Sequence, residues 1–141
     1  SIKRTKATPI QELLESDVDD KYTITQPSML RKIDSIDDGS GHSLKIITDH
    51  ALTVTTKQLR CPNSGIVPIN DTQYRLLTER ECFRLMGFTD QDFDKSFEVH
   101  PGIKGKLNGT LYKQAGNSIV VNVLESLFEQ IVEKHLNPIQ R

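Results

Sequence analysis

The chain has 141 residues, of which 35% are hydrophobic and 26% charged, and its formal net charge is -1. This length suits one globular domain with a modest core, and no apolar run approaches the roughly 18 residues of a membrane span. A clearly basic protein is the usual form of a free-standing DNA-binding domain, because phosphates must be neutralised. The composition therefore disfavours both membrane insertion and tight, autonomous binding to nucleic acid.

The first third of the chain predicts a basic tail followed by two short helices. Residues 1–7 are basic and polar. Thr8 to Gln11 combine an N-cap, a proline at the first helical position and a capping-box glutamine. A second helix is predicted after Thr25, where Met29, Leu30 and Ile33 follow Pro27 at helical spacing.

Residues 34–76 change to short apolar runs separated by turn-forming residues. The runs are Leu44–Ile47, Ala51–Val54, Ile66–Ile69 and Tyr74–Leu77. Short runs with Gly, Pro, Asn and Asp between them are typical of strands. This pattern predicts a small β region with long loops, which are the places where side chains vary most freely with a partner.

A capping box opens the next predicted helix. Thr78 and Glu81 have the spacing of that motif, and Gly87 is placed to end the helix. We therefore predict a helix over 79–86, with Cys82 as a small core residue on its apolar face. A brief helical turn from Thr89 to Phe93 and a glycine-rich loop over 100–110 are expected to follow.

Apolar pairs recur every four residues near the C-terminus and predict a long amphipathic helix. The stripe consists of Ile119, Val120, Val123, Leu124, Leu127, Phe128, Ile131 and Val132. Asn117 or Ser118 can cap its start, and Lys134 and His135 suit its C-terminal dipole. Such a wide stripe needs a partner surface.

Two stretches, Arg75–Phe88 and Tyr112–Leu124, resemble the last two recurring blocks of DNA (cytosine-5)-methyltransferases. The resemblance extends more weakly over 40–135, and proline is usual in the family where Glu79 and Thr89 stand here. The family's glycine-rich cofactor loop, its Pro-Cys nucleophile segment and its Glu-Asn-Val block are missing from the sequence. The chain therefore looks like the DNA-reading, C-terminal part of such an enzyme.

The resemblance implies an α+β fold in three parts. Residues 1–33 would form a linker with short helices, and residues 34–111 a small β-rich recognition region that includes the 79–86 helix. Residues 112–141 would supply a loop and an amphipathic helix that packs on a missing Rossmann-like catalytic domain. Without that domain, the helix would stand apart or pack against a second copy of the chain.

Site residues follow from the same resemblance. Arg75, with Arg80 and Glu81 in the same block, would help to order the recognition region against the rest of the enzyme. Gly116-Asn117-Ser118 would present backbone amides at a helix start, a geometry that favours anions. Asn117 and Ser118 would border the S-adenosylmethionine pocket, although plain helix capping is the simpler interpretation.

The DNA-reading residues are expected between 39 and 60. Ala51–Thr55 resembles the Thr-Leu signature of the family's recognition regions, with Thr53 as the contact and Val54 in the place of leucine. The flanking segments occupy the places of the two base-reading loops and contribute Gly41, His42, Lys57, Gln58 and Arg60. Arginine and glutamine can bond to base edges and lysine to phosphates; the alternative is a solvated loop.

The implied enzyme would flip a cytosine out of duplex DNA and methylate its C5 with S-adenosylmethionine. Its nucleophile is not expected in this chain, because Cys61-Pro62 reverses the family's Pro-Cys order, and the chain alone is expected to be inactive. The cysteines show no zinc-binding spacing and the histidines are scattered, so no metal site is expected.

Expected partners are double-stranded DNA and an upstream catalytic domain or subunit, in a cytoplasmic, DNA-associated and prokaryotic setting. A separate natural subunit and an excised piece of a longer polypeptide both fit. The alternative function is a non-catalytic DNA-binding or interaction module derived from such an enzyme.

Overall fold

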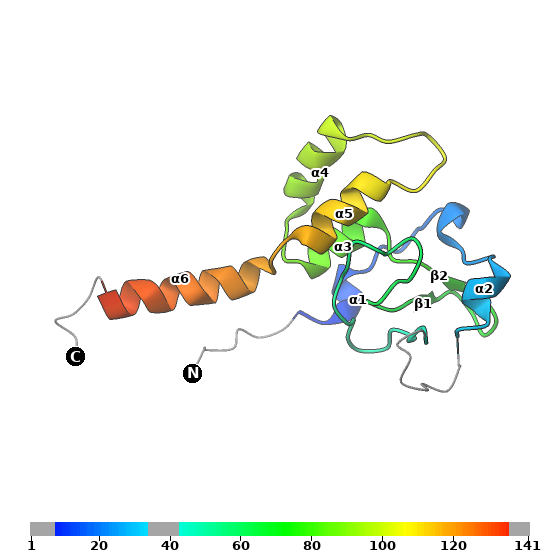
Figure 1. Ribbon diagram of the computed structural model, residues 1–141, viewed down its shortest axis with the longest axis horizontal. Helices are drawn as coiled ribbons and strands as arrows, with labels where there is room; N and C mark the ends of the chain where they lie inside the picture. The colour runs from blue at the N-terminus through cyan, green and yellow to red at the C-terminus, as the bar shows by residue number, and fades with distance from the viewer. Residues whose placement is uncertain (1–7, 34–42, 136–141) are drawn as a thin grey trace.

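A computed structural model describes residues 8–33 and 43–135 of the chain, so the predicted recognition residues Gly41 and His42 lie outside the described residues. The elements in chain order are α1 (Ile10–Leu13), the 3-10 helix η1 (Asp20–Tyr22), α2 (Pro27–Leu30), β1 (Val67–Pro68), β2 (Tyr74–Arg75), α3 (Glu79–Leu85), α4 (Asp90–Val99), α5 (Gly109–Asn117) and α6 (Val121–His135). Helix α3 lies inside the body with α4 and α5 beside it, and α6 projects outwards (Figure 1). None of the helices in the described ranges is long and apolar enough to cross a membrane.

The capping box of α3 is confirmed. The Glu81 amide donates to Thr78 Oγ1 at 3.1 Å, and the Thr78 amide donates to Glu81 Oε1 at 2.8 Å. The chain leaves this helix through Gly87, whose φ of 86° is in the region that favours glycine. The turn lies against the start of α6, where the Val121 amide donates to Met86 O at 2.9 Å.

Helix α4 is longer than the predicted turn through Phe93. Thr89 and Asp92 form a second capping box, and the helix then continues to Val99. Phe93 is buried edge-on against Phe83, with ring centroids 5.2 Å apart. The contact between α4 and α3 thus stabilises a helix whose own sequence is mostly polar.

The β region is smaller than predicted. The antiparallel pair β1 and β2 aligns Val67 with Arg75, and the segment around Thr23 adds a single bridge on the other side of β2. Ala51–Val54 forms no strand within the described part of the chain, although Val54 is buried. The α+β class is confirmed. The description of the region as β-rich is wrong, because Ala51–Val54 has irregular backbone and the two strands are each only two residues long.

The core forms around α3 and α5. Cys82, Leu111 and Ala115 are fully buried, and Cys82 is confirmed as a core residue. Tyr112 is almost fully buried as well, and its hydroxyl donates to Leu77 O at 2.6 Å. This bond fixes α5 against the segment that leads from β2 into α3.

The predicted helix start at Gly116-Asn117-Ser118 is wrong. Asn108 caps α5, and this helix continues through Gly116 and Asn117. Ser118 then ends it, since both its amide and its hydroxyl donate to Ala115 O. The buried face of α5 extends the helix to this point, and the next helix begins at Val121.

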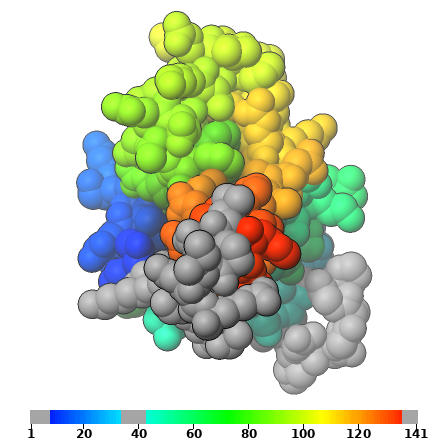
Figure 2. Space-filling view, turned by 90° about the vertical axis from the view of Figure 1, so that its left-hand side faces the viewer, coloured from blue at the N-terminus to red at the C-terminus, as the bar shows by residue number. Residues whose placement is uncertain are grey.

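The apolar stripe of α6 is exposed. Within the described residues α6 buries none of its side chains, and Phe128 is 63% exposed. Seen from the α6 side, the helix lies in front of the body with α4 above it (Figure 2). This face of the helix is available to a partner surface.

Candidate nucleic-acid interface

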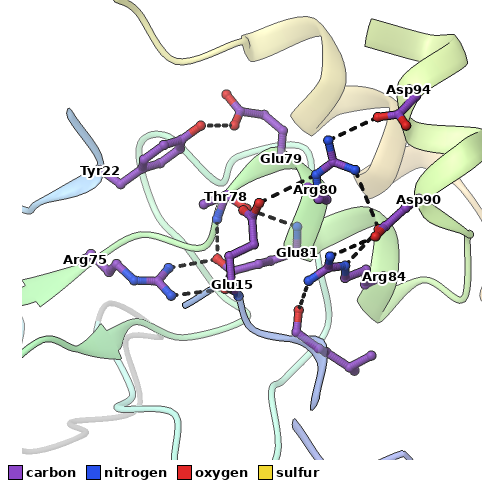
Figure 3. Close-up of polar contacts among 11 residues, drawn as sticks. Glu15, Tyr22, Arg75, Thr78, Glu79, Arg80, Glu81, Arg84, Asp90 and Asp94 are labelled. Carbon is purple, nitrogen blue, oxygen red and sulfur yellow. Dashed lines mark hydrogen bonds and ion pairs between the residues drawn. The ribbon is translucent and has the colours of Figure 1, made fainter. Parts of the chain in front are cut away.

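A buried ion pair joins β2 to α3. Arg75 Nη1 and Nη2 donate to Glu81 Oε1 and Oε2 at 2.8 and 3.0 Å, and the two side chains are only 9% and 0% exposed (Figure 3). Glu81 also accepts hydrogen bonds from the Thr78 amide at 2.8 Å and the Glu15 amide at 3.0 Å. The carboxylate therefore has four donors around it, and removing one charge of such a pair is costly.

Glu79 forms a second buried connection at the start of α3. It accepts hydrogen bonds from the Tyr22 hydroxyl and, at 2.7 Å, from the Asn108 amide. Burial, followed by the hydrogen bond to Glu79, raises the pKa of Tyr22 above its ordinary value. One carboxylate thus joins η1, α3 and the cap of α5.

Ion pairs continue from α3 to α4 at the surface. Arg84 makes two hydrogen bonds to Asp90 at 2.8 and 2.9 Å, and these lower the pKa of Asp90. Arg80 pairs with Asp94 at 3.0 Å and lies 4.5 Å from the Phe93 ring centroid. The side chains of Arg80 and Arg84 are therefore occupied by contacts within the chain.

The structure brings the predicted residues Arg75, Arg80 and Glu81 together around α3. The sequence did not indicate Glu15, which contacts both Arg80 and Glu81. It also did not indicate Glu79 and its two partners, Tyr22 and Asn108. A glutamate in the first turn of a helix is ordinarily a solvated residue that favours the helix dipole. Neither local spacing nor composition signalled that Glu79 would be buried.

Residues 51–60, here named the recognition loop, carry four of the predicted DNA contacts. Thr53, Lys57 and Arg60 are exposed on this loop, and their contact with DNA stays a prediction. Backbone bonds shape its end, because the Arg60 and Cys61 amides donate to Lys57 O at 3.0 and 2.8 Å. The structure thus places three polar side chains of suitable chemistry on one surface loop.

Gln58 points the other way, into the core, and its base contact stays a prediction that would require the side chain to leave this buried position. It is 2% exposed and donates to Ser64 Oγ at 2.6 Å and to Cys82 Sγ at 3.6 Å. Its Oε1 atom has no hydrogen-bond partner among the described residues. Gln58 fixes the loop to the core through its hydrogen bonds to Ser64 and Cys82.

Asn117 and Ser118 lie at the junction of α5 and α6. Asn117 is exposed as the last residue of α5, whereas the Ser118 amide is already bonded to Ala115 O at 3.2 Å. The geometry is a helix end, so it does not supply the free amides that were predicted to favour an anion. In the described ranges, no group of three or more His, Cys, Asp or Glu side chains could hold a metal ion.

Comparison with known proteins identifies the family. The model of C-5 cytosine-specific DNA methylases matches residues 3–133. An orphan methyltransferase of Bacillus phage SPbeta is 48% identical over 98 residues, which are 70% of this chain and 20% of that protein. An orphan methyltransferase of Bacillus phage SPR is 39% identical over 100 residues, or 70% of this chain and 21% of that protein.

Solved structures share the fold. The methyltransferase EhMeth of Entamoeba histolytica superposes with a TM-score of 0.66 at 19% identity, over 92% of this chain and 42% of that one. The S. pombe Dnmt2 methyltransferase gives a TM-score of 0.65 at 23% identity, over 92% and 43%. The chain spans about a fifth of the length of the phage relatives that it matches. Because the family model covers almost all of its residues, the chain belongs to the C-5 cytosine-specific DNA methylase family.

Proposed function

We propose that this chain is the target-recognition and cofactor-pocket-completing part of a DNA (cytosine-5)-methyltransferase. The observation that carries the proposal is the recognition loop, which exposes Thr53, Lys57 and Arg60 while Val54 and Gln58 are buried beneath it. Arginine can bond to the O6 and N7 atoms of guanine, and lysine and threonine can reach phosphates. A fixed loop with an exposed polar edge suits the reading of a DNA groove.

The chemistry would require an upstream catalytic domain or subunit. The complete enzyme would flip the target cytosine, attack its C6 with a cysteine thiolate and transfer methyl from S-adenosylmethionine to C5. Cys82 is unsuited to this attack, because it is fully buried and burial raises the pKa of its thiol to about 12. Cys61 precedes Pro62 instead of following a proline, so we assign the nucleophile to the catalytic region and expect the chain alone to be inactive.

Helix α6 would dock on that catalytic region. Its exposed apolar face, which includes Val123, Leu127 and Phe128, is the kind of surface that a partner covers. Docking of α6 would place the preceding junction, with Asn117 and Ser118, beside the catalytic domain. These two residues would there complete the S-adenosylmethionine pocket.

The recognition role is tested by Arg60→Ala in the chain mixed with its catalytic region. If Arg60 reads a base, the variant should lose about 1–3 kcal/mol of discrimination at one position of the DNA site. Methylation rates on duplexes that differ by single base pairs measure this loss. Lys95→Ala, which removes an exposed charge on α4, is the control and should leave the site preference unchanged.

Two other outcomes are informative. An equal loss on every DNA sequence would mark Arg60 as a phosphate contact. Unchanged methylation rates of Arg60→Ala on all duplexes would show that Arg60 does not contact DNA. The same result for variants of Thr53 and Lys57 would contradict the recognition role of the loop.

A further inference from the structure

The recognition loop touches α5 at a residue that has no side chain. A Cβ atom built on Gly116 would lie 2.4 Å from both Thr55 C and Thr56 N, and 2.7 Å from Thr55 O. Carbon atoms in contact are ordinarily separated by about 3.5–4.0 Å. The peptide between Thr55 and Thr56 can therefore lie directly on α5 only because residue 116 is glycine.

We propose that Gly116 is a positioning residue for DNA recognition, which sets the height of the recognition loop above α5. The proposal rests on the function proposed above. Any side chain at position 116 would have to push the 55–56 peptide outwards by about 1 Å to reach ordinary contact distance. Thr53 and Lys57 lie within two residues of that peptide, so they would move with it.

The underside of the loop leaves little room for adjustment. Val54 is buried, and Gln58 is bonded to Ser64 and Cys82. The Leu52 amide also donates to Ser64 O at 3.0 Å. With both ends of the loop held, a larger residue at 116 would displace its middle, and packed interiors transmit such strain.

The same glycine is adjacent to the junction proposed to border the cofactor. Gly116 precedes Asn117 in the last turn of α5. The contact of Gly116 with the 55–56 peptide therefore fixes the position of the recognition loop relative to this turn. A change at position 116 would therefore act on DNA reading without altering any of the side chains proposed to touch DNA. That separates positioning from direct contact.

The first test compares Gly116→Ala with Gly109→Ala in the full chain. Gly109 is on the same helix, but among the described residues a Cβ there would meet only Leu59 Cδ1, at an ordinary 3.6 Å. Hydrogen exchange at the Arg60 and Cys61 amides should become about tenfold faster in Gly116→Ala and stay unchanged in Gly109→Ala. Equal exchange in the two variants would overturn the inference.

A measurement on the unaltered chain covers the case in which Gly116→Ala does not fold. Such close contact predicts a nuclear Overhauser effect between the Gly116 α-protons and the Thr56 amide proton. Its presence would support the direct backbone contact. Its absence in a folded chain would overturn the proposal without any variant.

The recognition role is tested in the mixture with the catalytic region. Gly116→Ala should reduce the ratio of methylation rates on the preferred and a single-base-altered duplex by about tenfold, whereas Gly109→Ala should keep it. An unchanged ratio, or a loss that is equal on all sequences, would show a merely structural glycine and overturn the positioning role. Absence of methylation by the unaltered mixture would contradict the proposed function itself, and the recognition role with it. The hydrogen-exchange experiment would still show whether Gly116 holds the 55–56 peptide against α5.

Discussion

Replacing Arg75 by methionine should lower the free energy of unfolding by about 3–5 kcal/mol, because Glu81 would become an uncompensated buried charge. Methionine retains much of the apolar volume of the arginine stem, so the loss should reflect charge more than packing. The affected carboxylate is fully buried and loses two hydrogen bonds of 2.8 and 3.0 Å. Among the described residues it keeps its bonds to the Thr78 and Glu15 amides.

A second substitution separates the two effects. In Arg75→Met/Glu81→Gln the buried charge is absent, and the glutamine oxygen can still accept a hydrogen bond from one backbone amide. The double variant should therefore be about 1–3 kcal/mol more stable than the sum of the two single losses predicts. Strict additivity would mean that the two side chains do not depend on each other.

Urea unfolding followed by far-ultraviolet circular dichroism measures these differences. Arg84→Met is the matched control, because it removes an arginine whose pair with Asp90 is largely at the surface, with side chains 23% and 49% exposed. Such a pair is expected to contribute about 1 kcal/mol or less. A loss in Arg75→Met no larger than that in Arg84→Met would refute the reasoning about burial.

Three further predictions concern the thiols and α6. Cys82 should resist iodoacetamide at pH 8 in the folded chain while the partly buried Cys61 reacts, and equal rates would contradict the burial of Cys82. Burial raises the pKa of the Cys82 thiol from 9.0 to about 12. The stabilising contribution of the buried neutral thiol should therefore be complete below pH 9 and be lost as the pH rises towards 12. Thermal melts should accordingly show a smaller alkaline decrease in stability for Cys82→Ala than for the unaltered chain. Phe128→Glu should weaken binding to the catalytic region at least about tenfold, as measured by calorimetry. The control Glu129→Gln should have little effect. Equal affinities of these two variants for the catalytic region would contradict docking through the apolar face of α6.

Local signals predicted some elements well. Helix α3 was predicted because Thr78 and Glu81 supply a complete capping box within four residues. The exposed stripe of α6 was predicted because its helical period is carried by many residues and needs no knowledge of the fold. Each of these signals comes from residues that are close together in the sequence, so it can be recognised without knowledge of the tertiary structure.

Other features depend on contacts between distant segments and could not be predicted in this way. The helix end at Asn117 follows from the packing of Leu111, Tyr112 and Ala115, which overrides the apparent N-cap at 117–118. Gln58 and Arg60 are both polar and were both predicted to bond to bases, but the fold buries Gln58 and exposes Arg60. The side of a loop that a residue faces is set by tertiary structure and not by residue type.

The most direct test of the central claim is methyl transfer to duplex DNA in three samples: this chain, the catalytic region, and the two mixed as separate polypeptides. S-adenosylmethionine with a labelled methyl group allows the product to be counted and located. Sequence-specific labelling of cytosine C5 in the mixture, and in neither polypeptide alone, is the predicted result. Labelling by the isolated chain would contradict the assignment of the nucleophile to the catalytic region, whereas a stable complex that transfers no methyl would indicate a non-catalytic DNA-binding or interaction module.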